Sequence, residues 1–534
     1  MACGKKCVTL QQTFREQMIF DELTYRVREA FGHEPTAEQE QAIRTFALFM
    51  TDRREEAVML LRGSAGTGKT TLAAAMVRAL LSLAGPSGQG VGYGSMPSRS
   101  ADGHRRERLV LLAPTGRAAK VFSLYAGHAA YTIHRRIYRQ RSMEGTFDLS
   151  FNGAQDTLFI VDEASMIGDS AAPGESPFGG GRLLDDLIRF VYNGRGCRLM
   201  LIGDRAQLPP VGLTESPALS ADVLRGYGLR PYECDLQEVL RQSHESGILF
   251  NATRIRQWGA AGGVRPTVLP QVTFRGFQDI RMVPGQELID ELAGSYQQVG
   301  LDDTLVITRS NKWANVYNQG IRNRILDRDA ELCAGDRLMI VKNNYYWTQQ
   351  GRPSDGGREG AGLSADGGRS GEEPRLDFIA NGDLAVVRRV RHQHELYGFR
   401  FAEVTMTFPD YGDLELTAMV LLDTLTSEAP ALTREQQQQL FDRVLEDYQD
   451  VPLKRDRLKR LKEDKYYNAL QVKFAYAATC HKAQGGQWAH VYVDQGYMTD
   501  DMLTADYLHW LYTAFTRATE RLYLVNWPAT QTAR

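Results

Sequence analysis

A glycine-rich segment, Gly63-Ser-Ala-Gly-Thr-Gly68-Lys69-Thr70, has the residue types and spacing of a phosphate-binding loop. It follows an apolar run at residues 58–61 and precedes a run at 72–83 that predicts a helix. In such a loop, backbone N–H groups close around phosphates at a helix N-terminus, a lysine reaches the β- and γ-phosphates, and a threonine hydroxyl binds Mg²⁺. The residues predicted to bind the nucleotide here are Gly63, Gly66, Gly68, Lys69, Thr70 and Thr71.

Two carboxylates, Asp162 and Glu163, follow a second apolar run at residues 158–161. Ligands bind at the carboxyl ends of strands in parallel α/β sheets, so this pair is expected beside the phosphate loop. Asp162 is expected to hold Mg²⁺ through water, and Glu163 to orient and deprotonate the attacking water. A third run, 199–202, leads into a proline-closed loop whose Gln207 amide is suited to sense the γ-phosphate. Together these segments predict a nucleoside triphosphate hydrolase.

Composition and charge exclude several classes of protein. The 534 residues are 43% hydrophobic and 24% charged, which is typical of a soluble chain with several globular domains. A formal net charge of −2 excludes a histone-like polycation but leaves room for a local basic groove. No run approaches a membrane span, and the N-terminal segment lacks the apolar stretch of a secretion signal. Six cysteines do not make a disulfide framework, and Cys3 and Cys7 lack a second pair at zinc spacing, so we expect a cytoplasmic protein.

The elements expected to position these residues are parallel strands covered by helices. Short runs rich in Val, Ile and Leu predict strands buried on both faces, and many are separated by segments long enough for a helix. They form two groups, one ending near Pro210 and one starting near Thr304, so the predicted fold is α/β with two parallel sheets. The runs are 58–61, 109–112, 158–161, 199–202, 305–307, 490–493 and 522–525.

A segment of different character, residues 331–467, interrupts the second group and predicts a β-rich insertion. It contains a Gly-rich stretch at 350–373 that predicts a flexible loop, and two similar stretches lie at 84–107 and 171–181. Asn381-Gly382 is typical of a turn. Strands are expected at 378–390, 400–408 and 414–422, and helices at 433–447 and 453–467.

In chain order, these and further motifs resemble those of the superfamily 1 helicases, specifically the RecD-like and Dda-like branch that moves 5′→3′ on single-stranded DNA. Thr36-Ala-Glu-Gln39 resembles the Q motif of that family, in which Gln39 would read adenine. The other segments that resemble family motifs are Leu112–Ala119 (Ia), Thr132–Arg135 (the adjoining DNA-contact motif), Asp162–Ser165 (II), Gly203–Gln207 (III), Leu240-Arg241-Gln242 (IV), Ala478–Gly485 (V) and Tyr512–Ala518 (VI).

The resemblance implies two RecA-like P-loop domains with ATP and Mg²⁺ in the cleft between them. Arg241 and Arg517, from the second domain, would then act as arginine fingers, although either alone also fits a surface ion pair. His134 alone also fits a structural histidine. The residues implied to bind the phosphates of a nucleic-acid strand are Pro114, Thr115, His134, Thr479, His481 and Lys482.

The expected domain limits follow from the same resemblance. The first RecA-like domain is expected at 1–235, the second at 236–330 and 468–534, and the insertion, a small barrel in this branch, at 331–467. A wedge insertion is expected at about 135–157, where residues 145–153 predict a hairpin with Phe147, Leu149 and Phe151 and an Asn152-Gly153 turn. In the family, such a hairpin splits duplex ahead of the motor.

Three further segments each fit two roles, and one residue differs from the pattern of the family. The basic run His134–Arg141 fits a nucleic-acid channel or a solvated face, and Asn343–Trp347 fits base stacking or core packing. Lys454–Lys462 fits an amphipathic helix or a phosphate-binding one. Gln487 stands where many relatives have an acidic residue, so ribose contact there is doubtful.

The expected function is an ATP-dependent helicase and translocase that moves 5′→3′ on single-stranded DNA and opens duplex with a 5′ single-stranded tail. We expect a monomeric motor in DNA repair, recombination or replication, working with proteins of those processes and not at a membrane. The alternatives are an RNA helicase of the same superfamily, because contacts to the 2′-OH are not visible in these motifs, and an ATP-switched DNA-binding subunit of a repair or defence complex. Intact Glu163 and Arg517 favour turnover over a switch.

Overall fold

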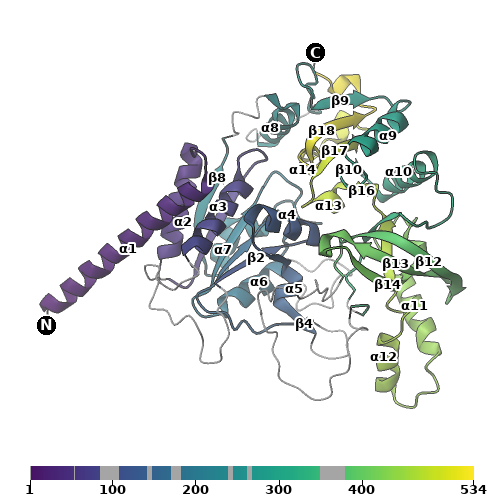
Figure 1. Ribbon diagram of the computed structural model, residues 1–534, viewed down its shortest axis with the longest axis horizontal. Helices are drawn as coiled ribbons and strands as arrows, with labels where there is room; N and C mark the ends of the chain where they lie inside the picture. Colours follow the sequence, from purple (N-terminus) through teal and green to yellow (C-terminus); the bar gives the residue numbers. More distant parts are fainter. Residues whose placement is uncertain are drawn as a thin grey trace.

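The computed structural model describes residues 2–52, 54–83, 108–140, 147–169, 182–238, 245–260, 268–344, 346–348 and 379–533. The three Gly-rich stretches expected at 84–107, 171–181 and 350–373 lie outside these residues. Figure 1 shows two α/β bodies and a β-barrel, with the long N-terminal helix projecting to one side. No helix in the described part of the chain is long and apolar enough to cross a membrane.

The first sheet is parallel, with strand order β3-β2-β6-β7-β1-β8. Alternate residues of its strands face opposite layers, so Met59 and Leu61 pack with α1 to α4 while Val58 and Leu60 pack with α5 to α7. This two-sided burial explains the uninterrupted apolar runs. The strands are β1 (Ala57–Gly63), β2 (Leu109–Ala113), β3 (Ala130–Thr132), β6 (Leu158–Val161), β7 (Arg198–Gly203) and β8 (Arg230–Leu236); the helices are α1 (Ala2–Phe31), α2 (Ala37–Thr51), α3 (Lys69–Leu83), α4 (Gly116–Ala126), α5 (Ile133–Ile137), α6 (Leu183–Tyr192) and α7 (Ala221–Gly226).

The second sheet is also parallel, with strand order β16-β10-β17-β18-β9. Helices α8 and α14 cover one face, and α9 and α10 cover the other (Figure 1). The α/β fold with two parallel sheets is therefore confirmed. The elements are β9 (Ile280–Val283), β10 (Thr304–Thr308), β16 (Ala477–Thr479), β17 (Trp488–Asp494), β18 (Ala518–Val525), α8 (Gly247–Ala260), α9 (Leu288–Gln298), α10 (Asn311–Arg324), α13 (Cys480–Ala483) and α14 (Ala505–Phe515).

The inserted strands close into a barrel that is connected to the second sheet by a short link. The predicted strand at 378–390 crosses a turn, and β12 starts only at Leu384, because Gly382 has a left-handed φ of 94°. The fifth barrel strand lies beyond residue 467, and only two residues separate it from β16. The barrel strands are β11 (Arg337–Ile340), β12 (Leu384–Leu396), β13 (Phe399–Phe408), β14 (Leu414–Leu421) and β15 (Leu470–Phe474); α11 (Arg434–Glu446) and α12 (Lys454–Lys462) join β14 to β15.

A buried ion-pair network fastens the barrel to the second sheet. Arg322 on α10 and Arg328 both pair with Asp336, which precedes β11, at 3.1 and 3.0 Å. The Tyr476 hydroxyl, between β15 and β16, donates to the same carboxylate at 3.0 Å. Because one apolar core also runs from the barrel interior to a face of the second sheet, the two form a single packed unit.

A hairpin forms in the expected region, and its two strands pair before Asn152. Strand β4 (Tyr138–Gln140) pairs antiparallel with β5 (Phe147–Leu149), and their connection, 141–146, lies outside the described residues. The predicted Asn152-Gly153 turn is wrong, because the second paired strand ends at Leu149 and no described strand that follows Gly153 pairs back on it. Asn152 is instead buried, and its amide donates to Phe190 O (2.9 Å). Leu149 packs against the core, whereas Phe151 is 75% exposed.

Candidate active site

The glycine-rich loop joins β1 to α3 at the carboxyl edge of the first sheet. Gly66 and Gly68 have φ values of 79° and 77°, a left-handed conformation that other residues rarely adopt. A Cβ atom on Gly63 would lie 2.7 Å from Thr67 Oγ1 and 2.9 Å from Lys69 Cγ. Glycine is therefore required at all three positions for the loop to close this tightly.

The first turn of α3 leaves the predicted phosphate-binding residues accessible. Lys69 and Thr70 are half-buried and Thr71 is exposed. The Lys69 ammonium lies 3.3 Å from Ser64 O, a main-chain oxygen of the loop itself. A phosphate at this helix N-terminus would meet both the lysine charge and the helix dipole.

Gln39 is buried against the same loop. Its Nε2 donates to Thr67 O at 2.9 Å, while its Oε1 accepts from Thr36 N at 3.0 Å as part of the capping box that starts α2. The structure thus ties the Q-motif-like helix to the phosphate loop. Adenine reading by Gln39 stays a prediction.

The predicted carboxylates lie at the end of β6 with different environments. Asp162 is buried, and desolvation together with the charge of Glu163 raises its pKa to about 7. Its Oδ1 accepts from Glu163 N at 2.8 Å, and Glu163 itself has a left-handed φ of 52°. A buried carboxyl beside a second carboxylate favours a cation nearby, so Asp162 and Thr70 suit the Mg²⁺ that accompanies a nucleotide.

Arg517 approaches these carboxylates from the second sheet. It follows α14, is buried, and donates to Thr513 O and Gly486 O, both at 3.1 Å, which holds its side chain in place. Its Nη1 lies 4.0 Å from Glu163 Oε1. In the amide orientation that satisfies both neighbours, Gln207 donates to Glu163 Oε2 and accepts from Arg517 Nη2, each at 3.2 Å. The structure thus brings Glu163, Gln207 and Arg517 together, while Arg241 lies outside the described residues.

Two residues of the cleft escaped the sequence prediction. The buried Tyr512 hydroxyl donates to Asp204 Oδ2 (2.5 Å) and accepts from Ala65 N (2.8 Å), so it joins α14 to the phosphate loop. Arg256 on α8 donates to Ser64 Oγ. Tyr512 opens the segment that resembles motif VI, which was an available signal. Arg256 lies in a helix with no motif.

The predicted strand-contacting residues lie on both sides of the domain interface. Thr115 caps α4, and a Cβ on Gly485 would lie 3.2 Å from its Oγ1. Thr479 precedes α13, which carries the exposed His481 and the half-buried Lys482. The Lys482 ammonium is buried without a hydrogen-bond partner among the described residues, and desolvation lowers its pKa to about 7.

His134 is half-buried in the first domain. It lies in α5, and burial lowers its pKa to about 4, so the ring carries no charge at neutral pH. Its ring centroid is 5.6 Å from that of Tyr138. This environment fits the structural interpretation of His134, and strand contact by this residue stays a prediction.

The structure also places Trp347 and the basic helix α12, two barrel features for which the sequence left two roles open. Trp347 packs against the barrel core, and its indole Nε1 donates to Asn468 O at 2.8 Å, which favours core packing for that residue. Helix α12 buries Leu461 and leaves most of its cations exposed, as an amphipathic helix does.

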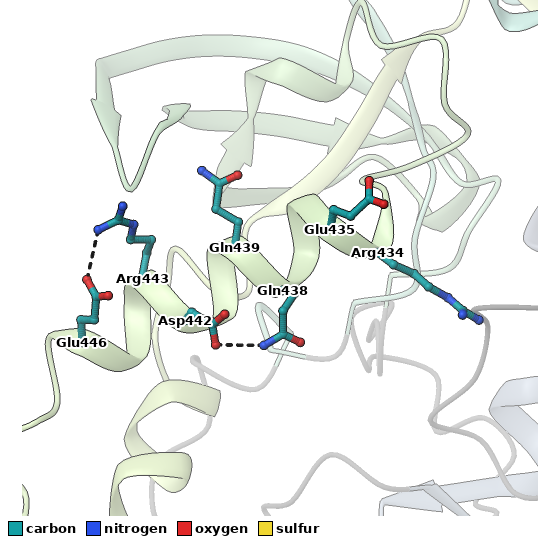
Figure 2. Close-up of a pocket in the computed structure, with 7 residues that line it drawn as sticks. All are labelled: Arg434, Glu435, Gln438, Gln439, Asp442, Arg443 and Glu446. Atoms are coloured by element: carbon teal, nitrogen blue, oxygen red, sulfur yellow. Dashed lines mark hydrogen bonds and ion pairs between the residues drawn. The ribbon is translucent and has the colours of Figure 1, made fainter.

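An open pocket along α11 is remote from this chemistry. Figure 2 shows that its lining comes from one helix, with Gln438 donating to Asp442 (2.9 Å) and Arg443 paired with Glu446 (3.3 Å). None of the predicted site residues lines it. The candidate site is the cleft between the two sheets.

Comparison with known families agrees with this architecture. Residues 34–257 match the AAA domain, and residues 474–525 match the UvrD-like helicase C-terminal domain. Both matches agree with the resemblance to the superfamily 1 helicases that the motifs carry. The resemblance drawn from the motifs is therefore confirmed.

Individual relatives are distant. The chain is 24% identical over 351 residues to the ATP-dependent DNA helicase dda of Enterobacteria phage T4, covering 63% of this chain and 65% of that protein. It is 32% identical over 154 residues to the ATP-dependent RecD2 DNA helicase of Deinococcus radiodurans, covering 29% of this chain and 16% of that protein. The match thus spans less than two thirds of the length of both curated relatives.

Solved helicase structures share the arrangement only loosely. The Pif1 helicase from Bacteroides in complex with ADP-AlF3 and single-stranded DNA has a TM-score of 0.42 at 13% identity, covering 94% of this chain and 95% of that one. Pif1 from Candida albicans has a TM-score of 0.37 at 15% identity, covering 94% and 97%.

Proposed function

We propose that this chain is an ATP-dependent DNA helicase that moves 5′→3′ along single-stranded DNA and opens duplex. The observation that carries the proposal is the approach of Arg517 to Glu163 and Gln207, because it brings a guanidinium of the second α/β body to the carboxylate and the amide that the first body supplies for hydrolysis. This arrangement supports hydrolysis that responds to the relative position of the two sheets. Both halves of the cleft come from one chain, which supports a monomeric motor.

The chemistry follows from the residues at the cleft. Lys69 would bind the β- and γ-phosphates, and Thr70 and Asp162 would hold Mg²⁺, which neutralises phosphate charge when bound. Glu163 would orient and deprotonate the attacking water. Arg517 would stabilise the transition-state charge, an effect worth roughly 10³–10⁵ in rate in related phosphoryl-transfer enzymes.

Movement would follow from where these groups are attached. Tyr512 lies in α14 and Arg517 follows that helix, so both belong to the α/β body built on the second sheet, whereas the phosphate loop belongs to the body built on the first. Loss of the γ-phosphate removes the charge that attracts Arg517, so the cleft can open after hydrolysis. Thr115 and Thr479 lie on opposite sides of the interface, and alternating grip by such residues would carry a strand along.

The proposal extends to the setting of the activity. We place it in the cytoplasm, in DNA repair, recombination or replication, with single-stranded DNA and a 5′-tailed duplex as substrates. The RNA helicase and the ATP-switched subunit are the competing outcomes of the test below.

The test is the ATPase rate with no nucleic acid, with single-stranded DNA and with single-stranded RNA, followed by unwinding of 5′- and 3′-tailed duplexes. We expect DNA stimulation and opening of the 5′-tailed duplex alone. Stimulation by RNA only would favour the RNA helicase, and stimulation without unwinding would favour a translocase or switch. Lys69→Ala is the control and should lose hydrolysis while keeping the fold; near-normal hydrolysis would overturn the assignment of the phosphate site.

A further inference from the structure

We infer that Trp313 and Tyr497 form a base-stacking platform for single-stranded DNA at the carboxyl edge of the second sheet. The inference rests on the proposed function and adds a residue-level contact for the bases to it. Neither residue belongs to a segment singled out by the motifs.

The two aromatic residues start from neighbouring strands. Strands β10 and β17 are adjacent and parallel, and Thr308 and Asp494 are in register at their carboxyl ends. Trp313 lies in the first turn of α10, just after β10, and Tyr497 lies in the loop after β17 (Figure 1 shows both elements). On the other side of β10, Thr308 is in register with Thr479, so the proposed strand-contacting loop leaves the same edge.

Both rings face solvent to an unusual degree. Trp313 is 51% exposed and Tyr497 81% exposed, whereas the other five tryptophans of the chain are buried or half-buried. An exposed indole or phenol ring offers a flat face that can stack on a base of single-stranded nucleic acid. The Trp313 amide donates to Ser310 Oγ at 3.3 Å, so the helix cap fixes the turn that presents the indole.

The two loops are joined, and the first presents two exposed cations. The Arg309 guanidinium, from the first loop, contacts Met498 Sδ in the second. Arg309 and Lys312 are both exposed. Of the carboxylates in the second loop, Asp494 accepts from the Tyr317 hydroxyl (2.5 Å) and the Gly496 amide (2.8 Å), and Asp500 accepts from Leu269 N (2.8 Å). Asp501 is exposed. Exposed aromatic rings interleaved with cations are the surface that sites for single-stranded nucleic acid use, since rings stack on bases and cations attract the backbone.

The test is quenching of intrinsic tryptophan fluorescence when oligo(dT) is added to the full chain. Because Trp313 is the exposed tryptophan, we expect quenching in the wild type and its loss in Trp313→Phe, which keeps an aromatic ring and near-normal affinity. Trp313→Ala should weaken binding by about five- to 150-fold, the range measured for one base stack. Tyr497→Ala should weaken it within the same range.

Two controls separate stacking from charge and from fold. Val316→Ala, on the next turn of α10 and also exposed, should leave both quenching and affinity unchanged. An abasic strand of equal length offers phosphates without rings, so wild type and Trp313→Ala should bind it equally.

The outcomes distinguish the inference from the function on which it rests. If wild type binds single-stranded DNA but Trp313→Ala binds it equally well, the platform is overturned and the helicase proposal stands. Quenching that persists in Trp313→Phe would also overturn it. If wild type shows neither binding nor DNA-stimulated hydrolysis, the proposed function itself fails.

Discussion

The α/β body built on the first sheet contacts the rest of the molecule at two places, the cleft and helix α4, and the residues that make the contacts differ. At the cleft, Arg517 and Tyr512 bring polar groups to the phosphate loop and its carboxylates. At α4, the barrel packs closely, and a Cβ on Gly116 would lie 2.4 Å from Asp383 Oδ1. Beside it, Arg117 stacks on Trp488 with its guanidinium 4.1 Å from the ring centroid.

This difference between the cleft and α4 indicates which contacts respond to the bound nucleotide. The cleft contacts involve charges that a γ-phosphate would attract or release. The α4 contacts lie away from the phosphate loop, and they join the helix that Thr115 caps to the barrel and to β17 of the second sheet. We therefore expect substitutions at the cleft to change rates strongly, and substitutions at α4 to change stability moderately.

The largest effect is expected for Arg517→Ala. It removes the guanidinium proposed to stabilise the transition state, so kcat for ATP hydrolysis should fall by about 10³-fold or more while nucleotide binding is kept. Steady-state hydrolysis and binding of a fluorescent ATP analogue measure the two effects. Arg517→Lys keeps a charge but loses the planar fork, and it should recover little activity.

A matched control is Arg205→Ala in the Gln207 loop, where the side chain donates to Leu219 O (2.8 Å) rather than facing Glu163. It should hydrolyse ATP at a near-normal rate. If Arg517→Ala did the same, the cleft would not differ from α4 in the way described here.

An intermediate effect is expected for Asp383→Asn at the α4 contact. Desolvation raises the pKa of the buried Asp383 from 3.8 to about 7, although Ala380 N and the Tyr411 hydroxyl donate to its carboxylate. The folded state therefore holds a proton that the unfolded chain loses above about pH 4. This contribution to stability is complete below that pH and is lost as pH rises through 7.

Asp383→Asn should remove this pH dependence. Its melting temperature should exceed that of wild type at pH 8, by an amount that corresponds to at most a few kcal/mol, and the gain should vanish or reverse near pH 4. Thermal unfolding at both pH values measures the effect. Asp413→Asn, at an exposed position of the barrel, is the control and should follow wild type. An equal shift in both variants would contradict the prediction.

The smallest effect is expected for the ion pair that joins α4 to the barrel. Lys120 Nζ lies 2.7 Å from Asp410 Oδ1, and the lysine side chain is 41% exposed to solvent. A double-mutant cycle of Lys120→Ala and Asp410→Ala should give a coupling free energy of about 1 kcal/mol or less, decreasing with added salt. A coupling that is larger and insensitive to salt would show that α4 depends on charge as the cleft does.

The strands that carry the site were predictable because their signal is local. The runs before Lys69, Asp162 and Gln207 are apolar at every position, since these strands are buried on both faces. Edge strands such as β9 and β8 escaped, because their half-exposed residues break the apolar run. The Asn152-Gly153 turn failed because the second paired strand ends at Leu149, and the buried Asn152 amide hydrogen-bonds to α6 instead.

The sequence by itself determined the phosphate loop, its glycines and the carboxylates that follow β6, because those features depend on neighbouring residues and on strand-to-helix turns. Only the tertiary structure decided that Arg517 lies beside Glu163, that Tyr512 and Arg256 reach the phosphate loop, and that Asp383 packs on Gly116. These pairs join residues far apart in the chain. No local pattern encodes such pairs, since they arise from how sheets and barrel pack to bury their apolar faces.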